Sequence, residues 1–241
     1  MIKLVYYIFL EVIFLLRTIF SGELDFMTAV VYIISALAVV FITMPIHEFA
    51  HGFAAVKLGD NTPRYQGRIT LNPFAHIDYI GSLSILLFGY GWAKPVQVNM
   101  FNFKNPKRDM ALTALAGPLS NIIVAFIATF LQLLIMVIVS FTNIVFLYYV
   151  ALIFSFISQI NISLAVFNLI PIPPLDVSRL LSALLPDRLY YKVMQYERII
   201  FYVLLVLLFT DVLDKPLMFA TDAIGNLIYA LASLPFKLFL N

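Results

Sequence analysis

The sequence predicts an all-α polytopic membrane protein with about five to six transmembrane helices. Of its 241 residues, 63% are hydrophobic, and the mean hydropathy is +0.99. A soluble chain of this length could not bury so much apolar surface. Apolar stretches long enough to cross about 30 Å of hydrocarbon recur along the chain. No polar stretch is long enough for a separate soluble domain, so we expect residues 1–241 to form a single integral membrane domain with its core in residues 27–215.

The long apolar runs predict membrane helices at residues 4–21, 27–56, 110–140, 144–170 and 196–213, with 216–240 as a sixth span or a surface helix. The first run contains Glu11 and Arg17 and lacks a small-residue cleavage site, so we interpret it as a retained helix rather than a signal peptide. Residues 81–93 are apolar but too short to span. They favour a re-entrant or irregular segment near the functional site, covered by protein or by a cavity.

Charged residues predict the orientation of these helices. Seven Lys or Arg residues lie between residues 57 and 108, and four lie between 179 and 198, whereas the opposite turns are mainly acidic. The positive-inside rule therefore places both basic loops in the cytoplasm. The helices at 27–56 and 144–170 then both run toward the cytoplasm, and we expect their ends to meet at a similar depth. Since topology explains the basic loops, we infer no nucleic-acid partner.

One motif stands out near the end of the second helix. Residues His47-Glu48-Phe49-Ala50-His51 match H-E-x-x-H. The two imidazoles, four residues apart, share one helix face and can reach one zinc ion. Glu48 lies about 100° around the axis, where it can act on a water as general base rather than as a ligand. A hydrogen-bonded His pair between helices is the plainer alternative, but Glu is costly at membrane depth, which favours a metal site.

A third metal ligand must be His, Asp or Glu, because the chain has no cysteine. Asp176 is the main candidate, since topology brings it to the depth of the histidines and the prolines at 171–174 prevent a regular helix before it. Asp176 could instead cap a helix that begins near Val177. His76 is the alternative ligand. Asn121 and Asn168 could be ordinary polar bonds between helices.

Four stretches within residues 41–215 carry a more specific pattern. They are Pro45-Ile-His-Glu-Phe-Ala-His-Gly-Phe-Ala-Ala55, then Gly67-Arg-Ile-Thr-Leu-Asn-Pro-Phe-Ala-His-Ile-Asp78, then Gly91-Trp-Ala-Lys-Pro-Val96 with Asn105-Pro-Lys-Arg-Asp-Met-Ala-Leu112 and Ala116-Gly-Pro-Leu-Ser-Asn121, and last Asn168-Leu-Ile-Pro-Ile-Pro-Pro-Leu-Asp176. Together they resemble the site-2 protease family of intramembrane zinc metalloproteases, in the small prokaryotic branch without PDZ or CBS domains.

The resemblance implies roles for particular residues. It implies that zinc is bound by His47, His51 and Asp176, that Glu48 is the general base, and that Asn168 helps to engage an unwound substrate. Asn121 is a second candidate for substrate contact, and His76 is a candidate accessory residue that could equally be a hydrogen-bonding loop residue. One position departs from the family pattern, which has Gly after the ligand Asp where this chain has Val177. If that Gly has positive φ, a β-branched residue would distort the turn.

The resemblance also implies a substrate and a location. The substrate would be a transmembrane helix of another protein, cut within or near the bilayer of a prokaryotic plasma membrane, at the cytoplasmic side. The sequence therefore predicts an intramembrane zinc endopeptidase. One alternative is a protein of the same fold that holds membrane helices without cutting them, disabled at Val177. The other is a zinc transporter, which should show repeated ligand sets, whereas this chain shows one. Neither role requires Glu48.

Overall fold

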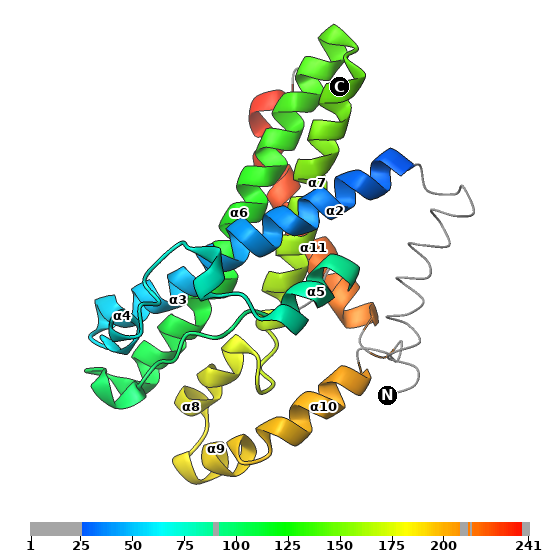
Figure 1. Ribbon diagram of the computed structural model, residues 1–241. Helices are drawn as coiled ribbons and strands as arrows, with labels where there is room; N and C mark the ends of the chain where they lie inside the picture. The colour runs from blue at the N-terminus through cyan, green and yellow to red at the C-terminus, as the bar shows by residue number, and fades with distance from the viewer. Residues whose placement is uncertain (1–25, 89–91, 208–211, 213, 238–241) are drawn as a thin grey trace.

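The computed structural model describes residues 26–88, 92–207, 212 and 214–237 (Figure 1). These residues fold into helices joined by turns and extended stretches, with no β-strand among them, so the predicted all-α class is confirmed. The helix predicted at residues 4–21 lies outside this described part of the chain.

The elements are α2 (Phe26–Ala38), η1 (Val39–Thr43), α3 (Met44–Leu58), α4 (Thr62–Tyr65), η2 (Pro73–Ala75), α5 (Tyr79–Phe88), η3 (Met100–Asn102), α6 (Pro106–Thr142), α7 (Val145–Asn168), η4 (Asp176–Leu180), α8 (Leu181–Leu184), α9 (Asp187–Met194), α10 (Glu197–Leu207), α11 (Asp214–Ser233) and η5 (Leu234–Phe236).

The helix predicted at 27–56 is confirmed as one continuous helical stretch of 33 residues, formed by α2, η1 and α3. Its middle, η1, is π-helical, and the Thr43 hydroxyl donates there to the Val39 carbonyl at 3.1 Å. Single π-turns inside α-helices often lie beside functional sites, and this one directly precedes the H-E-x-x-H turn. Gly59 ends the stretch with φ of 115°, a left-handed conformation that glycine adopts without strain.

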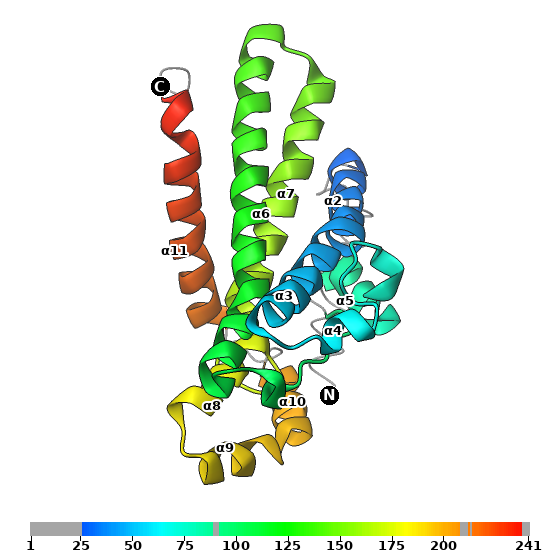
Figure 2. The ribbon, with the colours of Figure 1, turned by 90° about the vertical axis from the view of Figure 1, so that its left-hand side faces the viewer.

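Two long helices form the scaffold of the molecule. Helices α6 and α7 reverse direction at Asn143, which has φ of 54°, and pack against each other along their length. Helix α11 packs against both, and α2 packs against α7 (Figure 2). Between α6 and α7 the Thr129 and Ser158 hydroxyls share a hydrogen bond of 2.7 Å. Within the described residues, four helical stretches are long and apolar enough to cross a membrane: Phe26–Leu58, Pro106–Thr142, Val145–Asn168 and Lys215–Phe236. The chain is thus a multi-pass membrane protein.

The segment predicted to be re-entrant contains a short helix. Helix α5 has ten residues, about half of what a membrane span requires. A Cβ built on Gly81, near its start, would lie 2.0 Å from the Trp92 carbonyl oxygen. The start of α5 therefore packs against Trp92, and the re-entrant arrangement of residues 81–93 stays a prediction.

Short helices gather at one end of the long ones. Helices α4, α8 and α9 belong to the two basic loops, and both loops lie at the same end of α6 and α7 (Figure 2). This arrangement agrees with the prediction that both loops face one side of the membrane. The helix predicted at 196–213 corresponds to α10, of which eleven residues are described. Residues 208–211 and 213 lie outside the description.

Candidate metal centre

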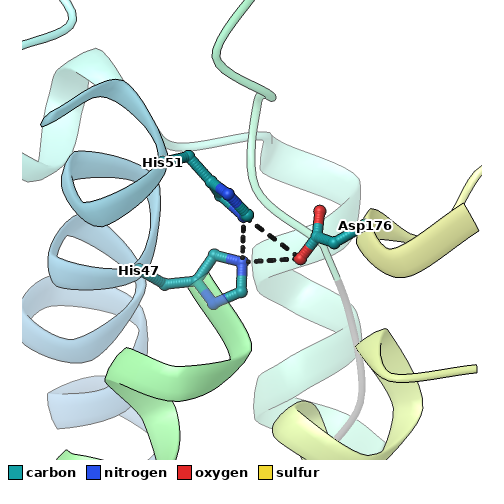
Figure 3. A group of neighbouring side chains, drawn as sticks. All are labelled: His47, His51 and Asp176. Atoms are coloured by element: carbon teal, nitrogen blue, oxygen red, sulfur yellow. Dashed lines mark hydrogen bonds and ion pairs between the residues drawn. The ribbon is translucent and has the colours of Figure 1, made fainter. Parts of the chain in front are cut away.

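Helix α3 presents two histidines toward the interior of the molecule. His47 and His51 are both 8% exposed and lie one helical turn apart. Their Nε2 atoms are 3.1 Å from each other, and the rings meet nearly edge-on (Figure 3). The i, i+4 spacing therefore does what the sequence predicts, bringing two imidazole nitrogens to one point.

Asp176 reaches the same point from the far side of the site. Its Oδ2 atom lies 3.1 Å from the His47 Nε2 and 3.2 Å from the His51 Nε2 (Figure 3). Helix α7 ends at Asn168, and the proline-containing stretch that follows leads into η4, whose first residue is Asp176. The N-cap position of η4 is occupied by Leu175 and Asp176 is the first residue inside the helix, so the alternative interpretation of Asp176 as the cap is wrong. Burial alone would raise the pKa of Asp176, but the neighbouring His51 and His47 outweigh it and hold the pKa below its usual range.

The described structure places His76 outside this group. Its Nε2 atom pairs with the Thr70 carbonyl oxygen at 2.9 Å, and the imidazole is almost completely buried in the loop after α4. The three residues whose ligand atoms lie within 4.8 Å of one another are His47, His51 and Asp176.

The donor set fits a tetrahedral metal ion. Three atoms that each lie about 2.0–2.1 Å from one zinc ion, at tetrahedral angles, are about 3.3 Å apart, and the observed separations are 3.1–3.2 Å. The His51 Nδ1 lies 2.7 Å from the Thr113 carbonyl oxygen, which can only accept, so Nδ1 carries the proton. With Nδ1 so occupied, Nε2 is the nitrogen of His51 that would bind a cation shared with the Asp176 carboxylate.

Helix α6 packs very closely behind the two imidazoles. A Cβ built on Gly117 would lie 2.2 Å from the His51 Nε2 and 2.7 Å from the His47 Cε1. Any side chain at this position would therefore occupy the space of the two rings. Gly117 therefore makes room for the histidines themselves.

Glu48 lies beside the group without joining it. The Val96 N–H donates to its Oε2 atom at 2.9 Å, and the side chain is 7% exposed. Val96 belongs to the stretch 92–99, which has no regular secondary structure and connects α5 to η3. Glu48 and His47 also line a cavity of about 260 Å³, together with Met44, Trp92, Ala93, Pro95, Asn121, Leu164, Phe167, Asn168, Pro174, Leu175, Asp176 and Phe201.

Comparisons with known proteins agree with this geometry. The family model described as Peptidase family M50 matches residues 134–210, which include Asp176. A Bacillus subtilis protein named "Putative zinc metalloprotease YwhC" is 42% identical over 179 residues, which is 74% of this chain and 80% of that protein. A Methanocaldococcus jannaschii protein named "Putative zinc metalloprotease MJ0611" is 33% identical over 159 residues, 63% of this chain and 71% of that protein. The chain belongs to peptidase family M50. This is the site-2 protease family that the sequence motifs resemble, and its members use zinc. No solved structure is significantly similar to the chain.

Both asparagines that the sequence analysis named, Asn121 and Asn168, line the cavity of this M50 chain. Asn121 comes from α6 and Asn168 from the last turn of α7. Val177 is 5% exposed and lies in η4, and among the described residues Asn143 alone combines a side chain with positive φ. The expected distortion from a β-branched residue after Asp176 is therefore wrong, because the backbone there is one that valine adopts readily.

Sequence reasoning missed two backbone contacts in this M50 site. These are the Val96 N–H on Glu48 and the Thr113 carbonyl on His51. Backbone groups carry no side-chain signature, so composition and spacing cannot reveal them. The only available sign was that both positions lie in or beside the stretches that resemble the family, 91–96 and 105–121.

Proposed function

We propose that this M50 chain is a membrane-embedded zinc endopeptidase that cuts transmembrane segments of other membrane proteins. The single observation that carries the proposal is the convergence of two imidazole nitrogens and one carboxylate oxygen within hydrogen-bond distance, beside a separate buried glutamate. The group lies in a protein whose long helices are membrane spans by length and composition. Membership of family M50 supports the peptidase class.

His47, His51 and Asp176 would hold the zinc ion, leaving a fourth position open, as catalytic zinc sites require. Bound zinc supplies Lewis-acid chemistry, since it polarises a carbonyl oxygen and makes a nearby water more acidic. The Thr113 carbonyl keeps a proton of His51 on Nδ1, so Nε2 would be the nitrogen that binds the ion.

Glu48 would move the protons of the reaction. One of its carboxylate oxygens accepts from the Val96 N–H, and the other remains available to take a proton from the attacking water. The same carboxyl group then gives that proton to the amine nitrogen of the departing peptide. Removing a positioned general base typically costs about 10²–10⁴-fold in rate.

The substrate must unwind before it can react, because a helix hides its amides in i→i−4 hydrogen bonds. The cavity offers polar groups for an unwound backbone at Asn121 and Asn168, within an otherwise largely apolar wall. Both are carboxamides, which can donate to carbonyls and accept from amides. This combination suits a segment that arrives from lipid and loses its internal hydrogen bonds.

The active site would face the cytoplasmic side of a prokaryotic plasma membrane. The support is the concentration of Lys and Arg in the two loops around the site. Topology reporters at residues 62 and 104 should both report the cytoplasm, and a reporter at 143 the outside. Reporters at 62 and 104 on opposite sides would contradict both the orientation and the re-entrant reading of the intervening segment.

The experiment that tests the function uses the purified full chain in detergent or lipid. A panel of single-span model helices is incubated with wild-type protein, with Glu48→Gln protein, and with wild-type protein plus a zinc chelator. Cleavage by the untreated wild type alone supports the proposal. If none of the helices is cut by zinc-loaded wild type, the chain holds or carries its ligand instead. Val177 does not have positive φ and lies in η4, so the backbone at this position gives no reason to suspect a disabled enzyme.

A further inference from the structure

Asp60 is a buried acid that the mechanism above does not use. Its side chain is 0% exposed and accepts four hydrogen bonds. The Oδ1 atom accepts from the Thr62 N–H at 3.0 Å, the Thr62 hydroxyl at 2.5 Å and the Asn102 amide at 2.7 Å. The Oδ2 atom accepts from the Asn99 N–H at 2.7 Å. Burial alone would raise the pKa of Asp60, but these bonds lower it below its ordinary value, so the group is an anion at neutral pH.

The backbone of Asp60 is fixed to the end of α3. Its N–H donates to the Ala55 carbonyl at 2.9 Å, directly after the left-handed Gly59. A Cβ built on Gly59 would lie 3.4 Å from the Asn102 carbonyl oxygen, so the helix end also touches the η3 turn. The C-terminal end of α3 is therefore tied to residues 99–102 by charge-assisted hydrogen bonds and by close packing.

The same stretch of chain meets the other end of α3 at Glu48. The Val96 N–H donates to the Glu48 carboxylate at 2.9 Å. One turn further along, the Val96 side chain lies close to Gly52, since a Cβ built there would be in ordinary contact with the valine Cγ1, at 3.7 Å. Residues 96–102 thus lie over one face of α3, held at Glu48 by one bond and at Asp60 by the bonds to Asn99 and Asn102.

We propose that Asp60 is a positioning residue for the general base: it fixes residues 96–102 on α3 so that the Val96 N–H meets the Glu48 carboxylate. The inference rests on the proposed function, because it matters only if Glu48 transfers protons. With one oxygen held by Val96, the carboxylate keeps its other oxygen free for the water. Misplacing a catalytic group by about 1 Å can cost about 10²-fold in rate.

Asp60→Asn removes the negative charge and one acceptor while keeping the size of the side chain. The amide keeps an oxygen for the Thr62 and Asn102 donors but sets an NH₂ group against the Asn99 N–H, where it cannot accept. We expect kcat to fall by up to about tenfold, while KM and the zinc content stay unchanged. Asn72→Ala is the matched control, because Asn72 accepts from the Phe74 N–H in the same kind of turn and bonds only within that loop. Its kcat should equal that of the wild type.

A double-mutant cycle decides whether Asp60 acts through the Val96 N–H. Val96→Pro removes that donor at a position outside any helix, directly after Pro95. In the Val96→Pro background, Asp60→Asn should cause little further loss of kcat, whereas independent structural effects would multiply. Hydrogen exchange of residues 97–103 should rise in Asp60→Asn protein and stay unchanged in Asn72→Ala protein, and melting temperatures identify any variant that fails to fold.

The outcomes separate the two proposals. If the wild type is active and Asp60→Asn has the same kcat, the positioning role alone is overturned. The same holds if Asp60→Asn protein loses zinc, or if the effects of Asp60→Asn and Val96→Pro on kcat multiply in the double mutant. A wild type that binds zinc and cuts none of the model helices overturns the proposed function, and this inference with it.

Discussion

The two functional faces of α3 are supported by different kinds of structure. His47 and His51 face α6, where Gly117 and the Thr113 carbonyl hold the imidazoles by helix packing. Glu48 faces an extended stretch of chain and is held by one backbone N–H, from Val96. Packed helices fix side chains by many contacts at once, whereas a loop depends on a few anchors. Metal binding and alignment of the base should therefore be separable by mutation.

The largest expected effect is on the helix face. His47→Ala or His51→Ala removes one of the two imidazoles that we propose as zinc ligands. Each variant should lose the bound zinc, about one ion per chain in the wild type, and all cleavage. Metal analysis of the purified proteins checks this. Zinc content unchanged in both variants would refute the assignment of the site.

Asp176 and His76 provide the next test, because both were candidates for the third ligand. Asp176→Ala should weaken zinc binding and abolish activity, since its carboxylate lies 3.1–3.2 Å from both imidazoles. His76→Ala should keep the metal, because its imidazole pairs with a backbone carbonyl instead. Zinc titration of both variants separates them. The reverse pattern would exchange the two roles.

Gly117→Ala tests the helix face without replacing any of the three proposed ligands. The new methyl group would overlap the His51 ring at 2.2 Å, so α6 must move or the imidazole must leave its position. Zinc affinity should fall markedly. Gly225→Ala is the control, since the nearest atom to a Cβ there is 3.8 Å away. Equal zinc affinity in the two variants would show that the packing behind the histidines is looser than described.

The smallest effect concerns Val177, which lies next to a ligand but is a packing residue. Val177→Gly removes a buried side chain and adds backbone freedom in η4. The variant should be destabilised by about 1–3 kcal/mol. Its melting temperature should fall while the cleavage rate of the folded protein does not rise. A faster enzyme at an unchanged melting temperature would restore the idea that valine strains the turn beside Asp176.

The parts of the molecule that the sequence predicted well are those fixed by local spacing or by the membrane. Apolar length predicted α2 to α3, α6 and α7, because hydrocarbon thickness sets the length of a span. The spacing of His47 and His51 predicted their common face, because helix geometry is fixed. Charge asymmetry predicted that α3 and α7 end near each other, and Asp176 indeed meets the histidines.

Contacts made by backbone groups across long sequence separations could not be predicted. Glu48 and Val96 are 48 residues apart, and His51 and Thr113 are 62 apart. Nothing in the type of residue 96 or 113 indicates that its N–H or C=O points at the site. The Val177 expectation failed for a related reason, since φ at one residue depends on the surrounding fold. The aspartate at position 60 carried no motif and emerged only from its burial and bonds.

The most direct test of the account compares wild-type and Glu48→Gln protein for zinc content and for cleavage of one model membrane helix, on the same preparations. We expect equal zinc in both proteins, about one ion per chain, with cleavage at least about 10²-fold slower in Glu48→Gln. Loss of zinc in Glu48→Gln would make Glu48 a ligand and contradict the separation of the two faces. Equal cleavage by both proteins would contradict its role as the general base.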